Sequence, residues 1–194
     1  MKERHLWRLI ATAHTRAIVE TLAGVRGLLG RKAAPEVIRF HRALVQAHRR
    51  AYRWDLWAAF ETALGGCDTE QFLDAISWLI LRGERTFRRV LADPDELARL
   101  PFQLAELSVA AGLLRAAPER LLPPHGPEED MRVFEEAISQ VFEEAISQVL
   151  GVVDPPGPPP GEPLQRDRES LRLRYPRLVA RHGLAAPEPS PERR

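Results

Sequence analysis

The stretch from Ala51 to Leu81, AYRWDLWAAFETALGGCDTEQFLDAISWLIL, constrains the fold more than any other part of this chain. It holds three of the four tryptophans, the single cysteine and the only pair of adjacent glycines. On both sides of the glycines the apolar residues recur at spacings of three and four, which is the period of an α-helix. We therefore predict two buried helices joined by a tight corner, with the first helix central in the fold.

The residues at the corner are suited to ending one helix and beginning the next. Gly65 can adopt the left-handed backbone conformation that ends a helix. Asp68 or Thr69 can cap the following helix with a side-chain oxygen, and Gly83 ends that helix. We expect three tryptophans to be mostly buried and to lie near one another: Trp54, Trp57 and Trp78.

Helical spacing continues outside this stretch. Residues 5–27, 35–49 and 102–114 each carry apolar residues along one side. The tetrapeptide Asp93–Glu96 is a helix start, because aspartate caps the first turn and proline fits the first helical position. No segment shows the alternation of a β-strand. The sequence therefore predicts an all-α fold, a compact orthogonal bundle of about six to eight helices.

Composition divides the chain into four parts. Residues 1–150 form the predicted helical domain, and residues 151–163, with six prolines and three glycines, form a proline-rich linker. Residues 164–184 form a short C-terminal helix, and residues 185–194 a disordered tail. We expect this helix to dock back onto the helical domain because it is too short to form its own core. Two of its residues would anchor it: Tyr175 and Leu178.

An eight-residue sequence, VFEEAISQ, occurs twice in succession, at Val133–Gln140 and at Val141–Gln148. The apolar pairs of the two copies recur every four residues, so the apolar stripe winds around a helix instead of keeping one face. We interpret the pair as a short tandem duplication. One copy is therefore predicted to be dispensable for folding.

Charge and cysteine content limit the class of protein. The chain has a net charge of +1, but residues 1–55 carry +8 and residues 118–163 carry −8. One cysteine permits no internal disulfide, which fits a reducing cytoplasm. No apolar run approaches the ~20 residues that span a membrane, and the N-terminal residues make a poor signal peptide. We therefore expect a cytoplasmic protein with no membrane association.

Several motifs together resemble a known bacterial family. The motifs are LWRLI at Leu6–Ile10, AYRWDLWAA at Ala51–Ala59, GGC at Gly65–Cys67, WLI-x-x-G at Trp78–Gly83, DPDELA at Asp93–Ala98 and RYPRL at Arg174–Leu178. In combination they are similar to the family called domain of unknown function 4240. The chain departs from that family where CDTEQFLDAISWLI replaces a Ser-Asp-Asp-Gly-Phe run and an aromatic-arginine pair. The resemblance implies a fold and no established activity.

One group of residues that could carry chemistry lies at the corner of the central stretch. Cys67 follows two glycines near a helix start, where the helix dipole lowers a thiol pKa and favours a nucleophile. Asp55 needs a charged partner or a helix N-terminus if it is buried, and Asp68 completes this polar corner. His41 and His48 are seven residues apart, without further ligands at metal-binding spacing. We predict neither a metal nor a cofactor.

A second group consists of basic residues at the end of the basic N-terminal region: Arg49, Arg50 and Arg53. The main hypothesis is a non-enzymatic interaction or regulatory module, for example an immunity or antitoxin-like protein, whose partner is another protein bound through these arginines. Two alternatives remain open. One is an enzyme built around the Asp55–Cys67 corner. The other is a weak nucleic-acid binder that uses the basic N-terminal half.

Overall fold

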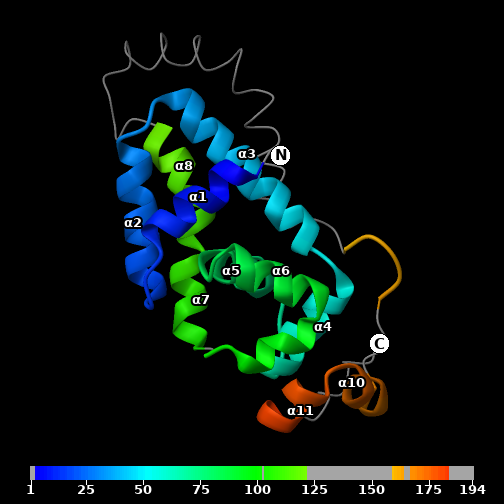
Figure 1. Cartoon of the computed structure of the whole chain (residues 1–194). Helices are drawn as coiled ribbons and strands as arrows, with labels where there is room; N and C mark the ends of the chain where they lie inside the picture. The colour runs from blue at the N-terminus through cyan, green and yellow to red at the C-terminus, as the bar shows by residue number, and fades with distance from the viewer. Residues whose placement is uncertain (1–2, 102, 122–158, 164–166, 184–194) are drawn as a thin grey trace, which may run out of the picture.

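The computed structural model describes residues 3–101, 103–121, 159–163 and 167–183 of the chain (Figure 1). These residues form ten α-helices and one 3-10 helix and contain no strand, which confirms the predicted all-α fold. The helices are α1 (Arg4–Ala13), α2 (Ile18–Gly30), α3 (Ala34–Ala51), α4 (Trp54–Leu64), α5 (Thr69–Leu81), α6 (Glu84–Ala92), η1 (Pro94–Arg99), α7 (Leu104–Ala110), α8 (Gly112–Leu121), α10 (Arg168–Arg174) and α11 (Pro176–His182). The octapeptide duplication, most of the proline-rich linker and the tail lie outside the described residues.

The described helices outnumber the six to eight predicted, and the N-terminal segment shows why. Residues 5–27 do not form one helix, because α1 ends at Ala13 and the chain turns before α2. The hydroxyl of Thr21 accepts a hydrogen bond from the backbone N–H of Thr15 at 3.0 Å, which stabilises this turn. Gly24 lies within α2 where a Cβ atom would stand 3.1 Å from the Cβ of Ala13, so the glycine permits a close approach of the two helices.

Prolines shape the second half of the chain differently from expectation. The Asp93 carboxylate caps the next element by accepting from the N–H of Asp95 at 3.1 Å, but that element is the 3-10 helix η1. Pro118, expected in an irregular connection, lies inside α8, which continues to Leu121. Since one side of α8 is buried against α2 and α3, packing outweighs the helical hydrogen bond that a proline cannot donate.

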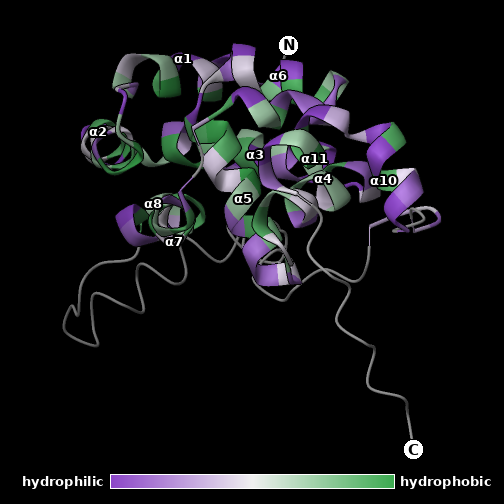
Figure 2. Ribbon diagram, turned by 90° about the horizontal axis from the view of Figure 1, so that it is seen from below, coloured by the Kyte–Doolittle hydropathy of each residue, from purple (hydrophilic) through white to green (hydrophobic). Residues whose placement is uncertain are grey.

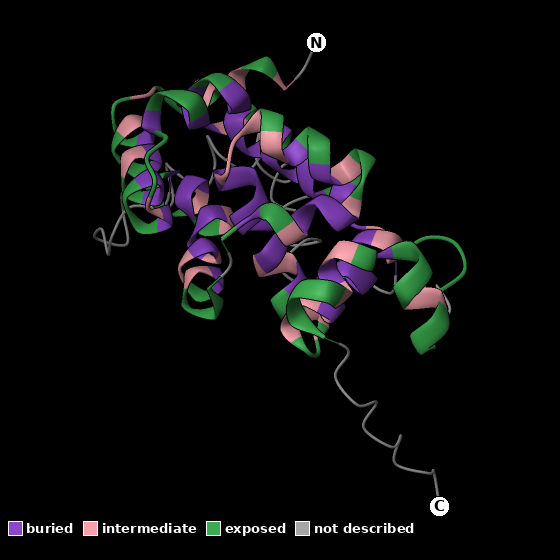
Figure 3. Cartoon of the chain, turned by 60° about the horizontal axis from the view of Figure 1, so that its bottom comes forward, coloured by how far each residue is buried: buried purple, intermediate pink, exposed green. Residues whose placement is uncertain are grey.

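Helix α5 occupies the centre of the molecule. All residues from Ala75 to Leu81 are buried, and α5 packs against α2, α3, α4, α6 and α7. On one side of α5, α1, α2, α3 and α8 pack against one another, and on the other side η1 packs against α4, α6 and α11 (Figure 1). Figure 2 shows that the helices carry both hydrophobic and hydrophilic residues, and Figure 3 shows the buried residues gathered where the helices lie together. The central stretch therefore organises the core.

The corner of the central stretch forms as its residues indicate. Gly65 ends α4 with a φ of 75°. The Asp68 carboxylate caps α5 by accepting from the N–H of Gln71 at 2.8 Å, and the Gln71 side chain accepts in return from the N–H of Asp68 at 3.2 Å. This reciprocal capping box satisfies backbone donors that would otherwise lack partners at the helix start.

The tryptophans of the central stretch belong to one chain of aromatic contacts. The rings of Trp54 and Trp57 stack at 5.5 Å between centroids, and Trp57 stacks on Phe72 at 5.0 Å. Phe60 then links Phe72 to the fully buried Trp78. Trp57 and Trp78 are buried, and Trp54 is partly buried and packs against the edge of the core. Its position at the first turn of α4 places it at the outer end of the stack.

The C-terminal helices α10 and α11 pack against the main body, with α11 in contact with α4 and η1 (Figure 1). Tyr175 and Leu178 are buried there, and the Tyr175 hydroxyl donates to the carbonyl oxygen of Asp55 at 2.7 Å. The Asp95 carboxylate accepts from the backbone N–H groups of Arg177 and Leu178 at 3.0 and 2.9 Å. An acidic side chain of η1 therefore caps a helix that begins about eighty residues later.

Within the described ranges, no helix combines the length and the apolar character that crossing a membrane requires.

Candidate interaction site

One face of α3 carries a row of polar residues. Arg39, Arg42, Gln46 and Arg50 follow one another at spacings of three and four, and all are exposed. The opposite face, which includes Phe40 and other apolar residues, is buried in the core. Since residues at these spacings share one side of a helix, burial of the apolar side directs the three arginines outward.

Helices α1 and α6 complete a groove along this face. The groove has a volume of about 1070 Å³, and Trp7 of α1 and Ala43 of α3 contribute apolar surface to it. Two glutamates also line it, Glu3 before α1 and Glu84 on α6. Its main feature is a set of five arginines, which defines it as the arginine groove: Arg4, Arg39, Arg42, Arg50 and Arg88.

Two ion pairs lie along the groove. Arg50 pairs with Glu3 at 2.5 Å, and the indole N–H of Trp7 donates to the same glutamate at 3.3 Å. Arg88 pairs with Glu84 at 2.6 Å. Three groove arginines form no salt bridge with a carboxylate of the described residues: Arg4, Arg39 and Arg42. The groove therefore presents net positive charge to an incoming ligand.

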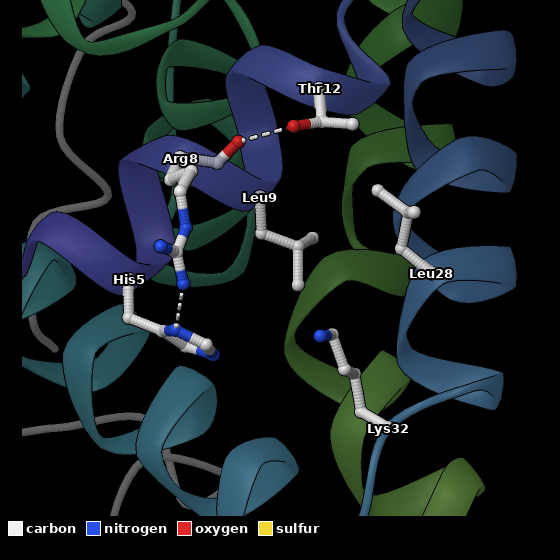
Figure 4. Close-up of a pocket in the computed structure, with 6 residues that line it drawn as sticks. All are labelled: His5, Arg8, Leu9, Thr12, Leu28 and Lys32. Carbon is white, nitrogen blue, oxygen red and sulfur yellow. Dashed lines mark hydrogen bonds between the residues drawn. The ribbon is translucent and has the colours of Figure 1, made fainter.

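A second cavity of about 400 Å³ adjoins the groove at His5, which lines both (Figure 4). Figure 4 shows His5 and Lys32 on opposite sides of this cavity, with Leu9 between them. The Nδ1 atom of His5 accepts from Arg8 at 3.3 Å, so the neutral ring carries its proton on Nε2. Burial, together with Arg8 and Arg39, lowers the pKa of His5. The buried Nε2 atom has no partner among the described residues, which leaves a donor for a ligand.

The structure separates the three basic residues that the sequence analysis grouped. Arg50 lines the arginine groove, whereas Arg49 is exposed near the end of α3 and does not line it. Arg53 forms a two-point ion pair with Asp55 at 3.0 and 2.7 Å and donates to the carbonyl oxygen of Leu91 at 2.9 Å. Arg53 thus joins α4 to the end of α6. The spacing of Arg39 and Arg42 along one face of α3 is visible in the sequence, whereas the contributions of α1 and α6 depend on the fold.

The polar corner is not one site. Asp55 lies in the first turn of α4, where its carboxylate accepts from the N–H of Leu56 at 2.8 Å and pairs with Arg53. Cys67 and Asp68 follow the other end of α4, and a helix of that length extends roughly 16 Å. The carbonyl oxygen of Cys67 accepts from the indole N–H of Trp57 at 2.8 Å. The arrangement holds the corner in place and does not join a nucleophile to a base.

The two histidines of α3 are buried, and neither has a metal-binding environment. The Nδ1 atom of His48 bonds to the carbonyl oxygen of Leu44 at 3.1 Å, and its Nε2 atom bonds to the Ser77 hydroxyl at 2.9 Å. Burial lowers the pKa of both His41 and His48 to about 4. No group of three or more histidine, cysteine, aspartate or glutamate residues in the described part of the chain could hold a metal ion.

The fold and the groove define a small all-α protein with a solvent-open, arginine-lined surface site. Comparison with known families makes this assignment more specific. The family described as Protein of unknown function (DUF4240) matches residues 1–119, which include every residue of the arginine groove. The chain belongs to this family, as the motifs between Leu6 and Ala98 indicated. No curated protein and no solved structure matches the chain.

Proposed function

We propose that this protein is a non-enzymatic interaction module of the bacterial cytoplasm, and that it binds an acidic segment of a partner protein in the arginine groove. The observation that carries this proposal is the gathering of five arginines against two glutamates around one groove. Planar guanidinium groups form paired, charge-assisted hydrogen bonds with carboxylates, which suits aspartate and glutamate side chains. An immunity or antitoxin-like protein is one version of such a module, because it acts by covering a partner's surface.

Two features of the groove support a protein partner. Trp7 and Ala43, which are each 4% exposed, form an apolar base beside the arginines, and the centre of a protein interface combines aromatic and arginine contacts. The ion pair of Arg50 with Glu3 joins α3 to the residue before α1, which reduces the ordering that binding would require. The enzyme alternative relied on Asp55 and Cys67, which lie at opposite ends of α4.

The test uses a fluorescently labelled octaglutamate peptide and the full-length protein, with binding measured by anisotropy at low and moderate salt. Reversing Arg39 and Arg42 together, as Arg39→Glu with Arg42→Glu, should weaken binding about ten-fold or more, because both arginines face the groove. These two residues are better targets than Arg50 and Arg53, whose ion pairs also hold the fold together.

The matched control is Arg16→Glu with Arg115→Glu, which makes the same charge change at exposed positions outside the groove. It should leave peptide binding within about two-fold, and both double variants should keep the thermal midpoint of the wild type. An equal loss in both variants would show attraction to overall charge instead of a groove, and would contradict the proposal. Tighter binding of a single-stranded oligonucleotide than of the peptide would favour the nucleic-acid alternative.

A further inference from the structure

The outer end of the aromatic stack is held rigidly. Trp54 stacks on Trp57 with 14° between the ring planes, and Trp57 stacks on the buried Phe72 with 19°. The indole N–H of Trp57 donates to the carbonyl oxygen of Cys67 at 2.8 Å, which fixes the middle ring. Trp54 is only partly buried. The stack therefore holds a large aromatic ring at the protein surface in a defined orientation.

A proline-rich part of the same chain is seated at this ring. The indole N–H of Trp54 donates to the carbonyl oxygen of Gly161 at 3.1 Å, although the two residues are 107 positions apart. Pro159 is buried, and Gly161 bends the chain with a φ of 92°. Figure 1 shows the segment 159–163 beside the junction of α3 and α4. The segment therefore combines a hydrogen bond to Trp54 with a buried proline two residues before the bonded carbonyl.

The chemistry of this contact is that of proline recognition. Proline-rich segments dock on surfaces lined with aromatic rings, because the pyrrolidine ring presents apolar C–H groups and the extended chain loses little entropy on binding. Such a segment has carbonyl oxygens but few N–H groups, so its hydrogen-bonding partner must be a donor. The indole of tryptophan is a donor with no acceptor atom. Trp54 supplies the donor, and its ring belongs to the aromatic stack beside the bonded segment.

We propose that the surface of Trp54 is a recognition site for a proline-rich segment of a partner protein, and that the chain's own Pro159–Gly161 segment occupies it in the unbound protein. An attached segment acts at an effective concentration in the millimolar range, so a weak contact suffices to keep the site filled. The partner's segment must then displace it. This site lies at the start of α4 and does not include the arginine groove, so the two binding functions are independent.

The experiment measures anisotropy of a labelled peptide, PPGPPPGEP, which has the sequence of residues 155–163. We compare the full-length wild type with a double variant that carries Pro159→Ala and Pro160→Ala. In this variant the chain's own segment should bind the Trp54 surface more weakly. The peptide should bind the variant at least about five-fold more tightly than the wild type, because the site is no longer filled from within. Trp54→Ala, introduced into that same variant, should reduce binding about ten-fold or more.

Two controls separate recognition from general stickiness. The same peptide with alanine at each proline should not bind any of these proteins. Trp54→Phe keeps an aromatic ring but lacks the N–H donor. In the Pro159→Ala, Pro160→Ala background, the Trp54→Phe protein should therefore bind the peptide more weakly than the protein that keeps Trp54 and more tightly than the one with Trp54→Ala. Circular dichroism and thermal midpoints establish that each variant is folded before its binding is compared.

Two results would overturn the proposal. If the peptide at millimolar concentration binds neither the wild type nor the folded Pro159→Ala, Pro160→Ala variant, the contact with Gly161 is internal packing only. If the wild type dimerises with increasing concentration, and Trp54→Ala stays monomeric in light scattering, the occupant is the proline-rich segment of a second copy. Either result leaves the proposal for the arginine groove untouched, since its test uses other residues and another peptide.

Discussion

At the scale of single residues, His41 stands out among the polar groups of the core. It is buried on α3, and neither of its ring nitrogens has a hydrogen-bond partner among the described residues. His48, which lies two turns further along the same helix, has both ring nitrogens hydrogen-bonded. An unsatisfied buried polar group costs free energy that a paired one does not. His41 therefore weakens the fold, and more so when the solution becomes acidic.

Acidification should destabilise the protein through these two histidines. Their pKa is lowered to about 4 in the folded chain from an ordinary value of 6.5, so the unfolded chain binds more protons between those values. The free energy of unfolding should therefore fall as pH decreases from 6.5 towards 4, by up to about 1.4 kcal/mol per pH unit for each histidine. Urea unfolding at a series of pH values measures this slope.

The substitution His41→Leu isolates one of the two contributions. At about pH 7.5 it should be neutral or stabilising, because it removes two unpaired polar atoms. The difference in the free energy of unfolding between His41→Leu and the wild type should increase by about 2 kcal/mol when the pH is lowered from about 7.5 to about 5. Burial and Glu70 raise the pKa of Asp74 to about 6, so protonation of Asp74 makes the free energy of unfolding rise as the pH falls in this range. This contribution is the same in both proteins and cancels when the variant is compared with the wild type. A difference that does not change with pH would contradict the prediction.

At the scale of elements, two of the glycines of α2, Gly24 and Gly27, have different environments although they lie one turn apart. A Cβ atom on Gly24 would lie 3.1 Å from the Cβ of Ala13 in α1. A Cβ atom on Gly27 would have no neighbour within 4 Å. Glycine is unfavourable inside a helix, so its presence at position 24 reflects the close packing of α1 and α2. No packing reason applies at position 27.

Substitutions at these two glycines should therefore have opposite effects. Gly27→Ala should increase the free energy of unfolding by about 0.5–1 kcal/mol, since alanine restricts the unfolded chain and fits the helix. Gly24→Leu should reduce it by about 1–3 kcal/mol, because its side chain forces α1 away from α2. Chemical denaturation of the two variants gives both values. Equal and small effects would mean that α1 and α2 do not pack closely at Gly24.

At the scale of the whole molecule, an acidic cluster joins the C-terminal helices to the body. The Arg177 side chain pairs with three carboxylates, at 2.8 Å with Asp95, at 2.5 Å with Glu96, and also with Asp93. Asp95 additionally accepts the backbone N–H groups of Arg177 and Leu178. Asp95 therefore both pairs with the Arg177 guanidinium and caps the first turn of α11, so docking of α11 depends on this residue most.

Removing the Asp95 carboxylate should release the C-terminal helices. The Asp95 side chain is 3% exposed, and Asp95→Ala should cost about 3–5 kcal/mol, because it leaves buried donors without an acceptor. Trypsin should then cleave quickly after Arg172 and Arg174. Asp93→Asn is the control, since the Asp93 side chain is 50% exposed and its loss of charge should cost less than about 1 kcal/mol. Equal tryptic rates in the wild type and Asp95→Ala would mean that the carboxylate does not hold α11 in place.

The sequence alone determined the features that depend on neighbours within a few residues. The helical period identified an all-α chain, and Gly65 and Asp68 marked the corner between α4 and α5, because capping involves atoms within one helical turn. The aromatic character of the central stretch also indicated the core. The sequence did not show that Trp54 is the outermost ring of the stack, because the period of a helix does not indicate where the stack meets solvent.

The tertiary structure alone decided which distant residues meet. Arg4, Arg42 and Arg88 come from three helices and share one groove, and the sequence spacing within α3 could indicate only one wall of it. The contacts of Asp95 with Arg177 and of Trp54 with Gly161 join residues more than eighty positions apart. Such pairs form because the whole chain buries its apolar area at once, and local propensity carries no information about which helix faces will then lie together.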